Sequence, residues 1–210
     1  MSSYLRPTDL NEALRALAEG GRTIVAGGTD FYPARVGKPV VEDVLDVTAI
    51  SGLRAIEDRG DHYYIGATAT WTDLIRADLP DWFRALKQAA REVGGVQIQN
   101  AGTIVGNVCN ASPAADGVPG LVALDASVQL GSVSGERDIP ITDFIRGNRK
   151  TARNPDEMVL GLRVPKCGAD ARSAFLKLGA RKYLVISIVM VSAVLERAPD
   201  GTVERLRIAG

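Results

Sequence analysis

The sequence has very few of the residues that bind metals. Cys109 and Cys167 are its only cysteines, and His62 is its only histidine. An iron–sulfur cluster normally takes four thiolates and a structural zinc ion takes four Cys or His ligands, so this chain supplies neither set. We therefore predict no metal site, and we assign no residue as a catalytic acid or base. Any redox chemistry here needs an organic cofactor.

Excess charge and long apolar runs are also missing. Lys plus Arg number 25 and Asp plus Glu number 25, so no overall field draws the chain to nucleic acid. No apolar run approaches the roughly 20 residues that span a bilayer, and the N-terminus lacks the layout of a signal peptide. We expect no nucleic-acid partner, no transmembrane segment and a cytoplasmic location. With 210 residues and 46% hydrophobic content, the chain can bury the core of one or two domains.

Hydrophobic periodicity predicts a mixed order of helices and strands. Thr8 is expected to cap a helix with one apolar face, which Gly20 and Gly21 end. A second helix is expected over 81–93. Strands are predicted at 23–26, 127–130 and 158–164. Two more are predicted at 44–47 and 63–67, which are rich in β-branched or aromatic residues.

The remaining segments complete an α+β pattern. Residues 97–119 are mostly Gly, Asn, Ala, Ser and Pro, which is poor material for a regular element. A short helix is expected at 121–124. The tail over 175–208 is typical of an antiparallel unit, with Pro199-Asp200-Gly201 as its hairpin turn.

A strand that runs into a glycine pair is the first candidate site. After Gly27 and Gly28, successive backbone N–H groups can point into one concavity, and such a nest binds phosphate oxygens. Thr29 offers a further hydroxyl donor. An ordinary turn explains the same pattern when it stands alone. The segment reads Ile24, Val25, Ala26, Gly27, Gly28, Thr29, Asp30 and Phe31.

A second segment concentrates hydrogen-bonding groups over residues 100–116. It is neither a Walker loop nor the Gly-x-Gly-x-x-Gly dinucleotide fingerprint. Gly106 permits close backbone approach, Thr103 and Asn107 carry hydrogen-bonding side chains, and Asp116 can accept from ribose hydroxyls. A surface Ω-loop is the alternative interpretation.

Together, the two segments resemble a known family. Residues 26–30, 103–107 and 111–116 look like the paired FAD-binding motifs of the xanthine dehydrogenase and carbon monoxide dehydrogenase flavoproteins, in order and spacing. In that family both glycine loops hold the FAD pyrophosphate, and the Asp of the Ser-Pro segment also contacts the cofactor. The resemblance implies that FAD is bound by residues 24–31 and by Thr103, Ile104, Val105, Gly106, Asn107, Ser112 and Asp116.

The similarity extends over nearly the whole chain. Residues 156–160 look like the family strand that passes near the flavin, and 175–181 look like a later family segment, so Val159 is expected to pack on FAD and Lys177 to lie near its ring. The resemblance implies a two-subdomain FAD-binding fold of the vanillyl-alcohol-oxidase type. We expect an FAD-binding domain at 1–171, with subdomains of roughly 1–55 and 56–171, and an incomplete C-terminal α+β domain at 172–210.

The resemblance also implies a function. The chain is expected to be the FAD-binding flavoprotein subunit of a molybdenum hydroxylase, an oxidoreductase built as a hetero-oligomer. A large subunit would carry molybdopterin and a small subunit would carry iron–sulfur clusters, with NAD, oxygen, a quinone or a carrier protein as the electron acceptor. Two alternatives are a self-contained FAD oxidoreductase of the same fold and a non-redox nucleotide-binding module.

Three departures from the family pattern stand out. Val105 occupies the place of the first of two adjacent glycines, so it must keep an ordinary α or β conformation. Val185 occupies a place where the family often has Asp, and we leave it out of the site. Family chains also continue past Gly210, which is expected to leave the last domain incomplete.

Overall fold

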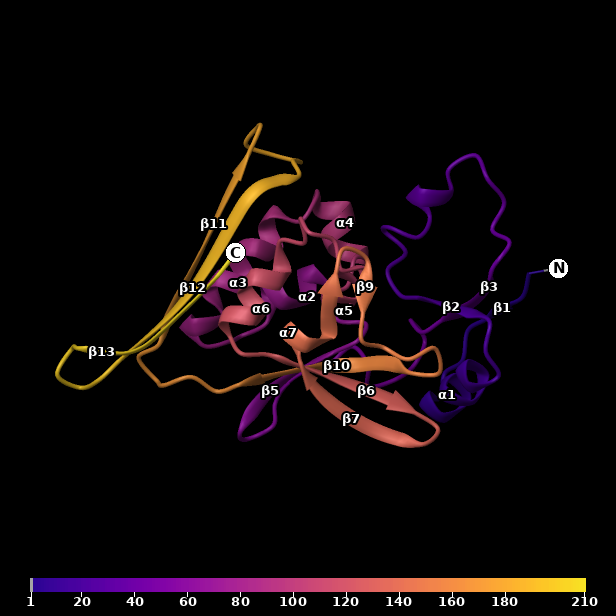
Figure 1. The fold of residues 1–210 in the computed structure, drawn as a ribbon, viewed down its shortest axis with the longest axis horizontal. Coiled ribbons are helices and arrows are strands. Elements are labelled where there is room, and N and C mark those ends of the chain that lie inside the picture. Colours follow the sequence, from indigo (N-terminus) through magenta and orange to yellow (C-terminus); the bar gives the residue numbers. More distant parts are fainter. Residues whose placement is uncertain (1) are drawn as a thin grey trace.

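The computed structural model describes residues 2–210 and contains three main sheets with helices between them (Figure 1). The N-terminal sheet consists of β1 (Tyr4–Leu5), β2 (Arg22–Val25) and β3 (Asp43–Asp46), and its order β1-β3-β2 is parallel throughout. Helix α1 (Leu10–Ala18) lies beside it, and a short 3-10 helix, η1 (Pro33–Arg35), follows the first glycine loop.

Helix α1 forms where it was predicted, but its cap differs. The carboxylate of Asp9 accepts from the N–H of Glu12 at 3.0 Å, so Asp9 rather than Thr8 is the N-cap. Both residue types cap well, and a sequence cannot separate neighbouring candidates. Gly20 and Gly21 have φ values of 83° and 75° and end the helix as expected.

The central sheet is antiparallel and carries the middle of the chain. It consists of β4 (Ile56–Asp58), β5 (His62–Gly66), β10 (Met158–Pro165), β6 (Ser127–Ser132) and β7 (Gly135–Pro140), in the order β4-β5-β10-β6-β7. Strand β10 therefore lies at its centre, and its residues 158–162 are all buried. The predicted strands at 63–67, 127–130 and 158–164 are confirmed within one or two residues.

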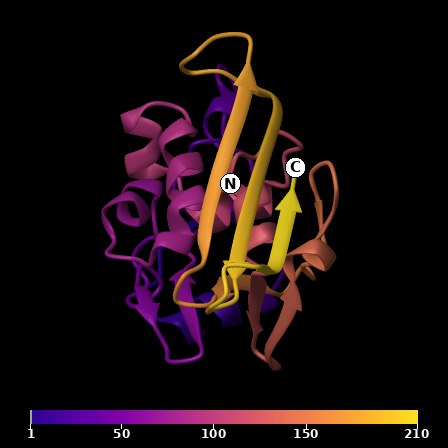
Figure 2. The same cartoon turned by 90° about the vertical axis from the view of Figure 1, so that its left-hand side faces the viewer.

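The helices form a layer between the central sheet and the last sheet (Figures 1 and 2). They are α2 (Trp71–Arg76), η2 (Asp81–Phe83), α3 (Arg84–Glu92), α4 (Val96–Ala101), α5 (Ile104–Asn110) and α6 (Gly117–Ala123). The expectation that 97–119 lacks regular structure is wrong. Capping and burial override the low helix propensity, since Thr103 accepts from the N–H of Gly106 at 3.0 Å, and Ile104 and Val108 are fully buried.

The C-terminal sheet closes the other side of this layer. Strands β11 (Arg172–Gly179), β12 (Ser187–Arg197) and β13 (Val203–Ala209) pair antiparallel in that order, as predicted for the tail. Phe175 and Met190 pack against Ala85 and Ala89 of α3. A small hairpin, β8 (Ile145–Gly147) and β9 (Lys150–Thr151), follows helix α7 (Ile141–Phe144). No helix among residues 2–210 is long and apolar enough to cross a membrane.

Candidate functional site

A cavity of about 890 Å³ lies where the first glycine loop faces α5, β10 and the β8–β9 hairpin. This volume is within the range of small-molecule and cofactor sites. The walls include every residue from Ile24 to Phe31, together with Thr103, Val105, Gly106, Asn107 and Val159. The fold thus brings together two sequence motifs that lie about 75 residues apart.

The two motifs approach each other through bare backbone. A Cβ added to Gly27 would lie 1.9 Å from the carbonyl oxygen of Ala101 and 2.9 Å from the Cα of Gly102. Since Cβ atoms do not come within 3.0 Å of such atoms, only glycine fits here. Gly28 has a φ of 68°, a left-handed value that favours glycine. Both glycines of the first loop therefore have a structural reason to be there.

The second motif forms the first turns of α5. Val105 lies inside this helix and keeps an ordinary α conformation, as expected. A Cβ on Gly106 would lie 2.6 Å from the Oγ1 of Thr103, so the cap itself requires glycine at this position. The Oδ1 atom of Asn107 is buried beside the cavity with no hydrogen-bond partner in the described chain. This atom faces Gly117 of α6, so Asn107 presents other atoms to the cavity.

Four residues with a predicted role do not line this cavity. Ile104 is fully buried in the core, and the Oγ of Ser112 accepts from the N–H of Ala114 in a local turn. The other two are Asp116 and Lys177, which form a buried ion pair at 2.7 Å.

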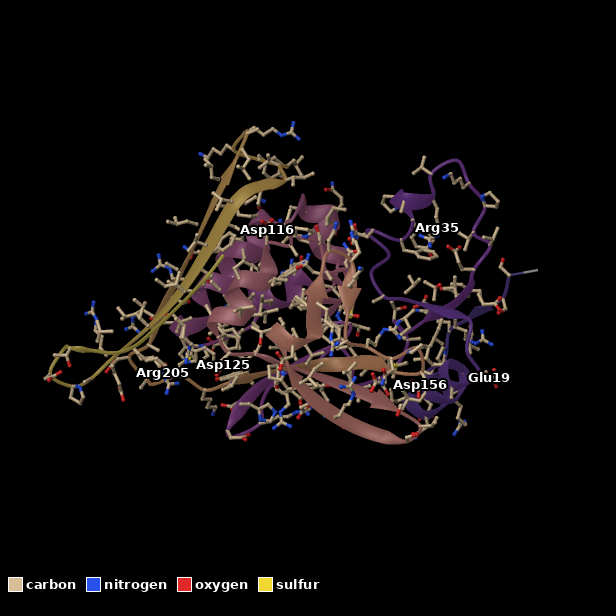
Figure 3. The ribbon with its side chains drawn as sticks, in the orientation of Figure 1. Glu19, Arg35, Asp116, Asp125, Asp156 and Arg205 are labelled. Carbon is tan, nitrogen blue, oxygen red and sulfur yellow. The ribbon has the colours of Figure 1, made fainter. Side chains whose placement is uncertain are left out.

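The ion pair joins the helix layer to the C-terminal sheet. The Nζ of Lys177 also donates to the carbonyl of Glu92 at 3.2 Å, and the hydroxyl of Ser187 donates to the second oxygen of Asp116. Figure 3 shows Asp116 between α6 and the C-terminal strands, well away from Arg35 of the N-terminal part. The structure therefore gives this carboxylate two partners within the protein.

Several lining residues escaped the sequence reasoning, and the charged ones are mostly cations. Arg22, Arg35, Arg149 and Arg153 line the cavity, against one acid, Asp30. Arg22 and Arg35 pair with Glu19 and Glu42 outside the wall, so Arg149 and Arg153 are the lining cations best suited to the negative charge of a pyrophosphate. The basic run over 146–153 was the available signal. The other unpredicted lining residues are Thr23, Ala34, Val47, Ala67, Trp71, Val93, Ile98, Gly102, Cys109, Asn110, Thr151 and Met158.

Arg35 holds the segment after the first loop in place. Its guanidinium donates to the carboxylate of Glu42 at 3.0 Å and to the carbonyl of Phe31 at 2.7 Å, and it stacks over the Phe31 ring at 3.8 Å. The hydrogen bonds from Arg35 lower the pKa of Glu42 to about 2. The cavity wall is therefore partly ordered by a charged contact within residues 31–42.

Cys109 combines an exposed position with an unreactive thiol. The residue lines the cavity and is exposed to it, yet the surrounding walls desolvate the thiol and raise its pKa to about 12. We expect a protonated thiol at neutral pH.

The fold, with a cavity between two glycine-containing segments, is that of a flavoprotein-type module. The match to the family model for the FAD-binding domain in molybdopterin dehydrogenase covers residues 1–167. The chain belongs to this family. The resemblance and the α+β FAD-binding fold expected from the two motifs are thereby confirmed.

Individual relatives agree with this assignment. The FAD-subunit of nicotinate dehydrogenase from Eubacterium barkeri is 37% identical over 200 residues, which cover 89% of this chain and 66% of the relative. The medium chain of glyceraldehyde dehydrogenase from Sulfolobus acidocaldarius is 32% identical over 78% of this chain and 59% of its own length. The chain therefore spans about two thirds of the length of these curated relatives or less.

A solved structure reproduces the whole fold. Reconstituted CO dehydrogenase from Oligotropha carboxidovorans superposes with a TM-score of 0.91 at 27% identity, over 99% of this chain and 73% of that chain. The C-terminal sheet is part of this match, because nearly all residues are covered.

Proposed function

We propose that this chain binds FAD in the 890 Å³ cavity and serves as the electron-transfer subunit of a molybdenum hydroxylase. One observation carries the proposal. The two family motifs lie on facing walls of one cavity, and the close approach of Gly27 to Ala101 leaves no room for a side chain between them. When bound, FAD accepts and donates electrons one or two at a time.

The chain's own residues supply binding and surroundings. Asn107 would offer a polar side chain to FAD, the lining arginines would balance its phosphates, and the buried Val159 would offer an apolar contact. We also propose Asp116 and Lys177 as residues near the flavin, although in the ligand-free chain they form an ion pair outside the cavity wall. We propose the division into 1–55, 56–171 and 172–210 because each part contains its own sheet.

The rest of the electron route lies on partners. With two cysteines and one histidine, the chain needs reduced iron–sulfur clusters on a small subunit as electron donors and a molybdopterin centre on a large subunit as the site of substrate oxidation. Electrons leave to NAD, oxygen, a quinone or a carrier protein. We place the complex in the cytoplasm. Relatives named as subunits or medium chains of dehydrogenases support this arrangement.

Two measurements test the proposal. The purified chain should bind FAD and show the flavin absorption band at ~450 nm, while a chain that binds none would refute the FAD site. Stopped-flow mixing with an organic substrate should reduce the flavin rapidly only after the small and large subunits are added. Fast reduction of the lone chain would instead show a self-contained FAD oxidoreductase, and bound FAD that no partner reduces would show a non-redox module.

A further inference from the structure

Three side chains from distant parts of the sequence form a continuous hydrogen-bonded chain at the cavity. The Nδ2 of Asn110 donates to the Oδ2 of Asp30 at 3.0 Å, and the Oδ1 of Asn110 accepts from the guanidinium of Arg149. Asp30 belongs to the first glycine loop, Asn110 ends α5, and Arg149 lies in the turn of the β8–β9 hairpin. All three residues line the cavity.

The residue types suit this arrangement. Arg149 can only donate hydrogen bonds and the carboxylate of Asp30 can only accept them. The amide of Asn110 does both, so it joins the two charged groups through complementary atoms. This pattern also fixes the orientation of the amide, because the opposite orientation would place donor against donor and acceptor against acceptor.

The backbone beneath Arg149 supports a role for its side chain. Arg149 has a φ of 57°, in the left-handed region that glycine or asparagine adopts more readily. Its N–H donates at 2.9 Å to the carbonyl of Ala111, the left-handed residue that ends α5. The hairpin turn is thus docked on the end of α5, which sets the position from which the Arg149 side chain reaches Asn110.

We propose that Asp30, Asn110 and Arg149 form a clasp that holds the first glycine loop against the rest of the cavity and slows the release of FAD. The proposal rests on the FAD site proposed above. The clasp residues are positioning residues, because they act through the loop that carries Gly27 and Gly28. Release of a ligand held between the loop and α5 requires the two to separate, and the clasp must open for that movement.

The sharpest test exchanges two of the three side chains. Asn110→Asp alone places two carboxylates side by side and should open the clasp, as Asn110→Ala should. When Asp30→Asn is combined with Asn110→Asp, the new amide at position 30 can donate to the new carboxylate at position 110. That carboxylate can still accept from the guanidinium of Arg149. We expect FAD release to be about fivefold faster or more in either single variant at position 110, and slower in the exchanged pair than in Asn110→Asp.

Hydrogen exchange of the ligand-free protein provides a second readout. Amides over 27–36 should exchange faster in Asn110→Ala than in wild type, while Asn148→Ala, an exposed change in the same hairpin turn, should leave them unchanged. Global unfolding by urea should be nearly the same in all variants, because the clasp lies at the surface of the cavity. A structural role in the core would instead lower the unfolding midpoint.

Two outcomes would overturn the clasp. If Asn110→Ala kept wild-type release and wild-type exchange, the contact would hold nothing. If Arg149→Ala weakened FAD while both changes at position 110 left release at the wild-type rate, Arg149 would act on FAD directly and not through the clasp. A wild-type chain that bound no FAD would refute the proposed function, and the exchange comparison in ligand-free protein would still decide the clasp.

Discussion

Replacing Gly27 by alanine tests the contact on which the cavity depends. The new Cβ would lie 1.9 Å from the Ala101 carbonyl oxygen and 2.7 Å from its carbonyl carbon. Contacts below 3.0 Å do not occur, so the two backbones must separate by about 1 Å or more. Neither backbone can yield as a flexible side chain would. We expect the overpacking to cost about 1–3 kcal/mol.

Part of this cost should appear as lost affinity for FAD, because the ligand is expected to touch both separated segments. Each 1.4 kcal/mol corresponds to a factor of about ten in the dissociation constant, so Gly27→Ala should weaken FAD by roughly tenfold. Titration of apoprotein, followed by flavin fluorescence, measures this constant, and urea unfolding of the ligand-free protein measures the remaining cost.

Gly168→Ala is the matched control, since a Cβ there meets only the Glu196 carboxylate at 3.6 Å, an ordinary contact. It should leave the FAD dissociation constant unchanged. If Gly27→Ala matched wild type in both FAD affinity and unfolding free energy, the proposed approach of the two motifs would be incorrect.

Further predictions concern charged groups and the thiol. Asp116→Ala should lower the free energy of unfolding by about 3–5 kcal/mol, because it leaves the Lys177 ammonium buried without its partner. Urea unfolding should show that adding Lys177→Met to Asp116→Ala recovers most of this loss. Asp116→Ala should also weaken FAD by about 1–3 kcal/mol, and an unchanged dissociation constant would restrict Asp116 to the ion pair. Because the pKa of Glu42 is lowered, its contact with Arg35 should stabilise the fold at neutral pH, and this contribution should be lost as the pH falls from about 4.5 toward 2. In an acid-unfolding titration, Arg35→Gln should remove this pH-dependent contribution. Because its pKa is raised, the Cys109 thiol should react slowly with iodoacetamide at pH 8, and bound FAD should slow the reaction further by covering the cavity. Labelling as fast as that of free cysteine would contradict the raised pKa.

The sequence by itself determined the family and most of the strands. The glycine pair at 27–28 and the motif at 103–107 carry information that depends on local residue types and their order, so they can be recognised without coordinates. Short, mostly apolar segments bounded by turn residues likewise located β5, β6 and β10.

Local propensity misled the prediction where tertiary packing was stronger. Residues 97–119 are poor helix formers, yet α4, α5 and part of α6 form there. Caps such as Thr103 and the burial of Ile104 and Val108 in the layer between two sheets supply the stability that the isolated sequence lacks.

Only the tertiary structure decided which polar groups meet. Asp116 and Lys177 are 61 positions apart, and Asn110 lies 80 positions from Asp30 and 39 from Arg149. Hydrogen bonds and ion pairs act over a few ångströms in space, whatever the separation along the chain. The sequence thus supplied the candidate side chains, and the packing of the helix layer between the sheets determined their partners.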